Sequence, residues 1–335
     1  MVYLVIIITQ MIYFILIIEY RRMNRKLYIK YQQRGGTDDP YLIYAVKSKH
    51  PYREIEQIIT SRKYTDYRQD NAPEITLDLN AKDNNGMTIL MYCAKMRHLN
   101  YVQLLLDHGA NDGEKDKDGR TALMYAVSAY TGSRESILSY DIVKILAETT
   151  NKNIQNKDGN TALMEAIIHY KPLAIIELLL KSGVNPNLKN NNNVAALLYA
   201  IRYFRSIEII KLLLINGADP NLKDDDNNTA LLDAIQYHRP VEIIELLLTY
   251  GADPNLKNNS NSTAFSIAKS YHDPNVLKLL EKYSKKTQEE PSRITQQKPI
   301  IAKDNEQIIS LLNNIDVVMK RKQNINNLLK ELQKK

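Results

Sequence analysis

Short apolar stretches with helical spacing recur through the middle of the chain at a nearly constant interval. Each unit opens with a segment of the type Thr-Ala-Leu-Met-Tyr-Ala and continues into a second apolar segment, such as residues 175–180 or 243–248. The opening residues are 33, 40, 34, 34 and 34 positions apart: Thr88, Thr121, Thr161, Ala195, Thr229 and Thr263. Self-similarity at such a period is typical of a solenoid, in which each unit buries its apolar face against the next. We therefore predict a stack of two-helix repeats.

Glycine and proline follow the same period. A glycine directly after a helix can adopt the left-handed conformation that ends it, and a proline cannot continue a helix. These positions are Gly183, Gly217 and Gly251, with Pro186, Pro220 and Pro254 three residues later. Pro240 and Pro274 are also 34 residues apart and separate the first helix of a unit from the second. One unit is thus predicted to contain a turn, a short helix, a second helix and an extended connection.

Two motifs resemble those of the ankyrin repeat. Residues 118–123, Asp-Gly-Arg-Thr-Ala-Leu, precede a first helix, and residues 251–255, Gly-Ala-Asp-Pro-Asn, follow a second helix. The resemblance covers residues 41–283, with six clear units and a degenerate first one, about seven in all. It implies an all-α ankyrin-repeat solenoid without enzymatic activity. It also implies that a partner protein binds the concave face formed by the hairpin tips and the first helices.

The sequence departs from the ankyrin pattern at three places. The Pro and His of the family's helix-opening motif are absent, so its Thr–His hydrogen-bond network is not expected, and buried Met and Leu side chains are expected to replace it: Met91, Met124, Met164, Leu198 and Leu232. The hairpin glycine becomes Asn193, Asn227 and Asn261 in later units, and Asn tolerates the left-handed conformation. The 40-residue spacing indicates an insertion, mostly within residues 131–139, between two helices.

The first residues form an apolar run. Residues 2–18 span about 25 Å as a helix, and Arg21 and Arg22 follow them. We expect a membrane anchor at 1–20 and a basic linker at 21–40, with the repeats on the cytosolic side. The alternatives are a short tail packed on the protein, or a start-site artefact, because Met11 and Met23 can each begin a shorter chain. Without an anchor we expect a cytoplasmic protein.

The last residues show a second helical pattern. Residues 284–303 are polar and lack periodicity, as in a linker. Residues 304–335 carry apolar side chains three and four positions apart, which predicts an amphipathic, coiled-coil-like helix. This helix either pairs with a partner or a second copy of the chain, or folds back on the last repeat. The sequence pattern is compatible with both.

Charge and chemistry narrow the possible functions. The net charge is +7, but residues 1–40 carry +3 and residues 284–335 carry +5, so the repeats are close to neutral and no nucleic-acid partner is expected. The single cysteine, Cys93, excludes a disulfide framework and is expected to be buried. His238 and His272 fall at the same place in adjacent units, which is weak ground for a metal site. We expect no catalytic residues, no cofactor and no metal.

The remaining candidates are surface residues for partner binding. Tyr203, Tyr237 and Tyr271 recur every 34 residues near the ends of first helices, and tyrosine is favoured at interfaces. Further candidates are Arg202 and His169 in equivalent regions, and the hairpin residues Asp224, Asp225 and Asp226. The alternatives are copied repeats without selection for contact, and hairpins that are simply solvated. The nearest alternative function is that of an adaptor that delivers host proteins to other machinery such as a ubiquitin ligase, as in ankyrin proteins of large DNA viruses and intracellular bacteria. A nucleic-acid-associated role through the basic ends is a further, less favoured alternative.

Overall fold

A computed structural model of the chain describes residues 41–47, 52–61, 63–65, 74–76, 78–129, 136–149 and 152–289. The chain divides into two compact units, residues 1–277 and 278–335, and the repeat helices up to residue 270 lie in the first. In these described ranges, no helix is long and apolar enough to cross a membrane. The predicted anchor at 1–20, the linkers at 21–40 and most of 284–303, and the predicted helix at 304–335 lie outside them.

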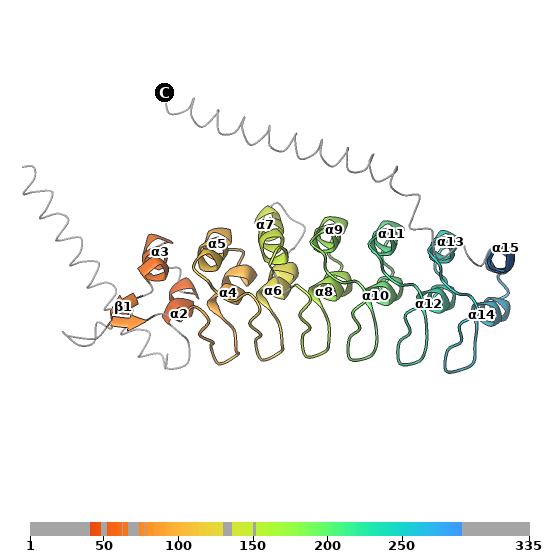
Figure 1. Cartoon of the computed structure of the whole chain (residues 1–335), viewed down its shortest axis with the longest axis horizontal. Helices are drawn as coiled ribbons and strands as arrows, with labels where there is room; N and C mark the ends of the chain where they lie inside the picture. Colours follow the sequence, from red (N-terminus) through yellow and green to blue (C-terminus); the bar gives the residue numbers. More distant parts are fainter. Residues whose placement is uncertain are drawn as a thin grey trace, which may run out of the picture. The chain divides into compact units, whose positions relative to one another are not determined.

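Helices of the described residues alternate between a first and a second helix of each repeat (Figure 1). The first helices are α2 (Tyr41–Lys47), α4 (Ile89–Lys95), α6 (Ala122–Ala129), α8 (Ala162–Ile168), α10 (Ala196–Arg202), α12 (Ala230–Gln236) and α14 (Ala264–Ser270). The second helices are α3 (Tyr52–Ser61), α5 (Leu99–Asp107), α7 (Ser136–Ala147), α9 (Leu173–Lys181), α11 (Ile207–Ile215), α13 (Val241–Thr249) and α15 (Pro274–Glu289). The predicted helical solenoid is confirmed.

The recurring threonine explains where the first helices begin. The hydroxyl oxygen of Thr161 accepts a hydrogen bond from the backbone N–H of Met164 at 3.3 Å, and Thr229 binds Leu232 in the same way at 3.4 Å. Such a cap satisfies a helix N–H group that lacks an intrahelical partner. Four second helices are followed by a glycine with positive φ, which was predicted for Gly183, Gly217 and Gly251 and is also found at Gly109.

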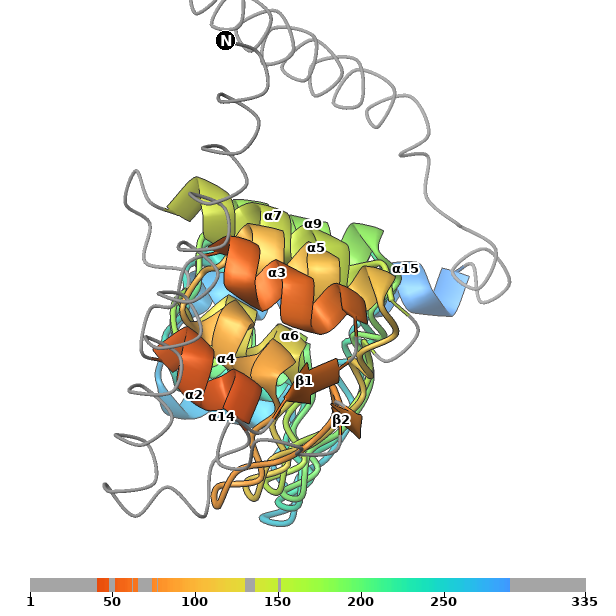
Figure 2. The ribbon, with the colours of Figure 1, turned by 90° about the vertical axis from the view of Figure 1, so that its left-hand side faces the viewer.

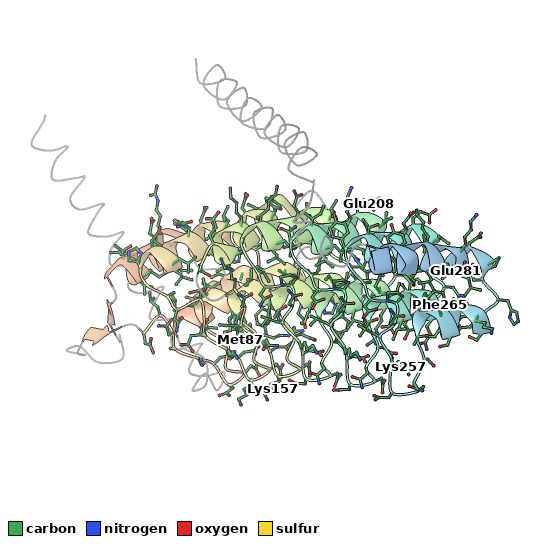
Figure 3. The ribbon with its side chains drawn as sticks, turned by 45° about the vertical axis from the view of Figure 1, so that its right-hand side comes forward. Met87, Lys157, Glu208, Lys257, Phe265 and Glu281 are labelled. Atoms are coloured by element: carbon green, nitrogen blue, oxygen red, sulfur yellow. The ribbon has the colours of Figure 1, made fainter. Side chains whose placement is uncertain are left out.

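The core lies between the row of first helices and the row of second helices, which Figure 2 shows along the stack. The Met and Leu side chains predicted to fill it are fully buried: Met91, Met124, Met164, Leu198 and Leu232. Cys93 is also fully buried, and burial raises the pKa of its thiol. The hairpins project on the side of the first helices, where Lys157 and Lys257 lie, whereas Glu208 lies on the side of the second helices (Figure 3).

Two features were not predicted from the sequence. Strands β1 (Lys63–Thr65) and β2 (Glu74–Thr76) pair antiparallel between the first and second repeats, with Lys63 opposite Thr76. The insertion lengthens a helix, because α7 has 12 residues where α5 and α9 have nine. The residues between α6 and the start of α7 lie outside the described ranges.

Candidate partner-binding surface

Each hairpin is closed by one Asp or Asn side chain. In the third repeat, Asp116 Oδ1 accepts hydrogen bonds from the backbone N–H groups of Asp118 at 2.9 Å and Arg120 at 2.8 Å. The same two bonds, to the residues two and four positions further on, recur in six hairpins. The closing residues are Asp83, Asp116, Asn156, Asn190, Asp224 and Asn258.

The closing residue also binds the first helix that follows it. Tyr125 donates its hydroxyl to Asp116 at 2.6 Å, and Tyr92 donates to Asp83 at 2.7 Å. Asn190 donates to the Tyr199 hydroxyl at 2.7 Å. These polar contacts join three of the hairpins to the helices that follow them, and the sequence pattern had not predicted them. The missed indication was the recurrence of Tyr nine residues after Asp or Asn.

Neighbouring hairpins are bound to each other through their backbones. Lys117 N–H donates to Asn85 O at 2.9 Å, and Lys157 N–H donates to Asp118 O at 2.9 Å. A Cβ atom added to Gly159 would lie 2.6 Å from the backbone nitrogen of Asn191, so the contact requires glycine there. We call the residues 83–86, 116–119, 156–159, 190–193, 224–227 and 258–261 the hairpin edge. Its polar groups are largely engaged within the array.

Arg202 is part of this hairpin network. Its guanidinium binds the Asp224 carboxylate and, at 2.7 Å through Nε, the carboxylate of Asp233, which is only 1% exposed. Burial disfavours the charge of Arg202, but the two carboxylates outweigh burial and raise its pKa above the usual value. Arg202 and Asp224 are therefore bound to each other. The sequence pattern had predicted an exposed Asp224 at the surface, whereas the side chain is buried.

The other predicted hairpin residues are more accessible. Asp225 Oδ1 accepts a hydrogen bond from the Asn193 side chain at 2.6 Å, and the carbonyl of Asp226 accepts one from Asn259 N–H at 2.9 Å. Both Asp side chains are exposed. His169 lies elsewhere, at the end of α8, with Nε2 3.1 Å from Glu165 Oε2.

A second edge is formed by the turns between the first and second helices of each repeat. We define the turn edge as residues 96–98, 169–172, 203–206, 237–240 and 271–273. One residue in each of these turns has a positive φ, between 51° and 63°: Arg97, Tyr170, Phe204, His238 and His272. None of them is Gly or Asn, although the chain uses Gly or Asn at the other left-handed positions, in the hairpins and after the second helices.

Exposed rings line this turn edge. Tyr170 is 61% exposed, Phe204 59%, Tyr237 40% and Tyr271 44%. Three of the left-handed residues meet the tyrosine of the next repeat: Tyr170 lies 6.1 Å from Tyr203, Phe204 6.5 Å from Tyr237, and His238 4.4 Å from Tyr271, between ring centroids. We call these six residues the aromatic row. It contains the three predicted tyrosines and three residues that the sequence analysis did not propose for binding.

The aromatic row also shows what His238, one of the two repeat-related histidines, contacts. His238 contacts Tyr271 rather than forming a site with His272. Across the described ranges, no cluster of three or more His, Cys, Asp or Glu side chains has the arrangement of a metal site.

Cations lie directly behind the rings. Lys171 Nζ donates to Ser128 O at 2.8 Å, Arg205 donates to Lys171 O, and Arg239 donates to Arg205 O at 2.5 Å. The two guanidinium groups cover rings, Arg205 over Tyr170 at 5.1 Å and Arg239 over Phe204 at 4.8 Å. Successive turns are thus joined by cations that reach back to the preceding repeat.

These two arginines differ from Arg202. Arg205 is only 7% and Arg239 only 8% exposed, yet neither guanidinium meets a carboxylate of the described residues. The Nε–H group of each is buried without an acceptor there. Burial lowers the pKa of both side chains. A shallow hollow of about 380 Å³ adjoins them, and Glu242 is the one carboxylate on its lining.

The helix pairs, closed hairpins and left-handed turns define a helical repeat solenoid. A sequence model of ankyrin repeats, in three copies, matches residues 42–146, 135–224 and 197–290. The chain therefore belongs to the ankyrin repeat family, whose repeats are in general modules for protein–protein interaction. No curated protein matches the sequence.

Solved structures agree with this fold. The ankyrin repeat domain of Bcl-3, described as a unique member of the IkappaB family, is 23% identical with a TM-score of 0.59, over 72% of this chain and 98% of that one. An ankyrin repeat domain from Acinetobacter baumannii AYE is 24% identical, with a TM-score of 0.51 over 58% and 97% of the two chains. The ankyrin repeat protein EF0377 is 27% identical, with a TM-score of 0.51 over 62% and 100%.

Proposed function

We propose that this chain is a non-enzymatic interaction module that binds a partner protein through the aromatic row. The observation that carries the proposal is the set of mostly exposed rings held side by side on the turn edge, three of which, Tyr170, Phe204 and His238, lie where the backbone favours glycine. Large, stiff aromatic side chains contribute much of the binding energy in protein interfaces. The hairpin edge is a weaker candidate because its side chains are mostly bound within the array.

The experiment is a capture assay with the full chain as bait and mass spectrometry to identify the partner. We expect the partner to be retained by wild type and lost from Tyr203→Ala/Tyr237→Ala/Tyr271→Ala. The matched control is Lys181→Ala/Lys211→Ala/Thr249→Ala, which changes three exposed positions on the second helices and is expected to retain the partner. Equal capture by both triple variants would contradict the proposal.

The array is further proposed to be tethered to a membrane. This rests on the apolar run at residues 2–18 and the arginines that follow it. Membrane sedimentation of the full chain beside residues 21–335 tests it. We expect only the full chain to sediment with membranes, and a full chain that stays in the supernatant would contradict the tether.

A further inference from the structure

Residues with a left-handed backbone conformation occur at three kinds of position in this array: hairpins, second-helix ends and turns. Hairpins place Gly or Asn at this conformation and second-helix ends place Gly, whereas the turns place Tyr170, Phe204 and His238 there. A bulky residue in the left-handed region is strained, and such strain tends to gather at functional sites. The rings are also largely outside the core, so burial does not explain their presence. Their presence on the turn edge is therefore best explained by what they contact outside the chain.

The cations behind the rings indicate the charge of that contact. Arg205 and Arg239 are buried charges without a carboxylate partner among the described residues. A buried charge is unfavourable unless an opposite charge compensates it. Every described turn from Arg97 to Arg239 carries a Lys or Arg. Among these described turns, the turn edge has no acidic residue before Asp273. An approaching carboxylate would meet positive charge that solvent screens weakly.

The hollow beside the aromatic row favours an apolar side chain on the partner. Phe204, Ile207, Pro240 and Ile243 contribute to its lining, next to Arg205 and Arg239. An apolar side chain fits such a lining, and a carboxylate beside that side chain would lie close to the two guanidinium groups. A ligand for this hollow therefore needs an apolar side chain and, next to it, an acidic side chain.

We infer that the partner presents to the turn edge a peptide segment that combines apolar and acidic side chains. Its apolar side chains lie against the aromatic row and in the hollow, and its carboxylates face Arg205 and Arg239. This inference rests on the proposed function, because it names the chemical class of partner for the same surface.

A single-stranded nucleic acid is the competing ligand for a surface with aromatic and basic residues. Such ligands stack their bases on open aromatic faces. Here Arg205 covers a face of Tyr170, Arg239 covers a face of Phe204, and neighbouring rings meet edge to face at interplanar angles such as 72° for Tyr170 and Tyr203. The arrangement favours side-chain insertion by a peptide over base stacking.

The first experiment selects peptides without assuming their sequence. A random 12-residue phage library is panned on the full chain and counter-selected on the variant Tyr170→Gly/Phe204→Gly/His238→Gly. We expect the peptides that only wild type retains to be enriched at least about twofold in Asp and Glu, together with aromatic or aliphatic residues. Row-dependent peptides that are basic or uncharged would overturn the inference and leave the proposed function standing. Absence of any row-dependent peptide would contradict both.

The second experiment tests the arginines directly by fluorescence anisotropy with a selected peptide. Changing its acidic residues to amides is expected to weaken binding to wild type about tenfold, and much less to Arg239→Met. Lys211→Met removes the same charge from an exposed second helix and is expected to keep the full tenfold effect. Equal effects in both variants would overturn the inference. So would tighter, row-dependent binding of a 20-residue oligothymidylate, which would assign the surface to nucleic acid.

Discussion

The hairpin edge and the turn edge belong to the same repeats and face the same backbone requirement. Both contain one left-handed residue per repeat, which is Gly or Asn in the hairpins and Arg, Tyr, Phe or His in the described turns. In the hairpins, the space beside Gly159 is filled by the next repeat. In the turns, the side chains of Tyr170 and Phe204 extend into solvent.

Arginine shows the same contrast. Arg202 is held by two carboxylates, whereas Arg205 and Arg239 are buried with carbonyl partners and rings but without a carboxylate in the described part of the chain. Hydrogen bonding within the hairpin edge therefore stabilises the array. The turn edge retains strain and uncompensated charge, as expected of a surface that is completed by a partner.

Replacing Arg202 of the hairpin network and Arg239 of the turn edge is expected to give the largest difference in the free energy of unfolding. Arg202→Met leaves the Asp233 carboxylate buried without its partner, and we expect the free energy of unfolding to fall by about 3–5 kcal/mol. Arg239→Met loses one hydrogen bond and the contact with the Phe204 ring but removes an uncompensated charge, so we expect a change within about 1 kcal/mol. Urea unfolding of the two variants measures both. Similar losses for the two would remove the distinction between the edges.

The closing residue of a hairpin has the next largest expected effect. Asp116→Ala removes the acceptor of two backbone N–H groups and of the Tyr125 hydroxyl, and we expect a loss of about 3 kcal/mol. Asp116→Asn keeps an acceptor at the same place, as Asn156 and Asn190 do in this chain, and we expect a loss below about 1 kcal/mol. Chemical denaturation distinguishes them, and equal losses would show that these hydrogen bonds contribute little.

A smaller effect is expected on the pH dependence of the free energy of unfolding. Burial raises the pKa of Asp83, but hydrogen bonds from Tyr92 and from two backbone amides, with the charge of Lys47, outweigh it, so the pKa lies below its usual value. The carboxylate therefore stabilises the fold at pH values above its ordinary pKa, and this contribution is lost as pH falls through the folded pKa. We expect the stability difference between wild type and Asp83→Asn to shrink as pH falls from 5 to 2, in urea unfolding at each pH. A constant difference would contradict this.

The sequence predicted the helices because apolar spacing and the capping threonines are local features. It did not predict the hairpin network, because Asp and Asn occur in turns for several reasons and their contact with Tyr92 or Tyr125 depends on the folded repeat. The strands β1 and β2 have three residues each, which is too short for a polar–apolar alternation to indicate a strand.

The binding surface was predicted in part. The spacing of Tyr203, Tyr237 and Tyr271 led to one half of the aromatic row, and their role in binding stays a prediction. Phe204 was missed because an apolar residue near a helix end is expected in the core, and its exposure follows from the left-handed backbone. Asp224 was proposed as a contact because three adjacent aspartates suggest an exposed ridge, whereas folding brings it to Arg202.

We expect the rings of the turn edge to serve binding and not the stability of the array. Urea unfolding of Tyr170→Gly/Phe204→Gly/His238→Gly beside wild type measures their contribution to stability. Glycine relieves about 1 kcal/mol of strain at each position, while the two lost cation–ring contacts are worth about 0.5 kcal/mol each. We predict an unfolding free energy that is unchanged or higher by up to about 2 kcal/mol. A fall of more than about 2 kcal/mol would show that the rings are structural and would contradict the account.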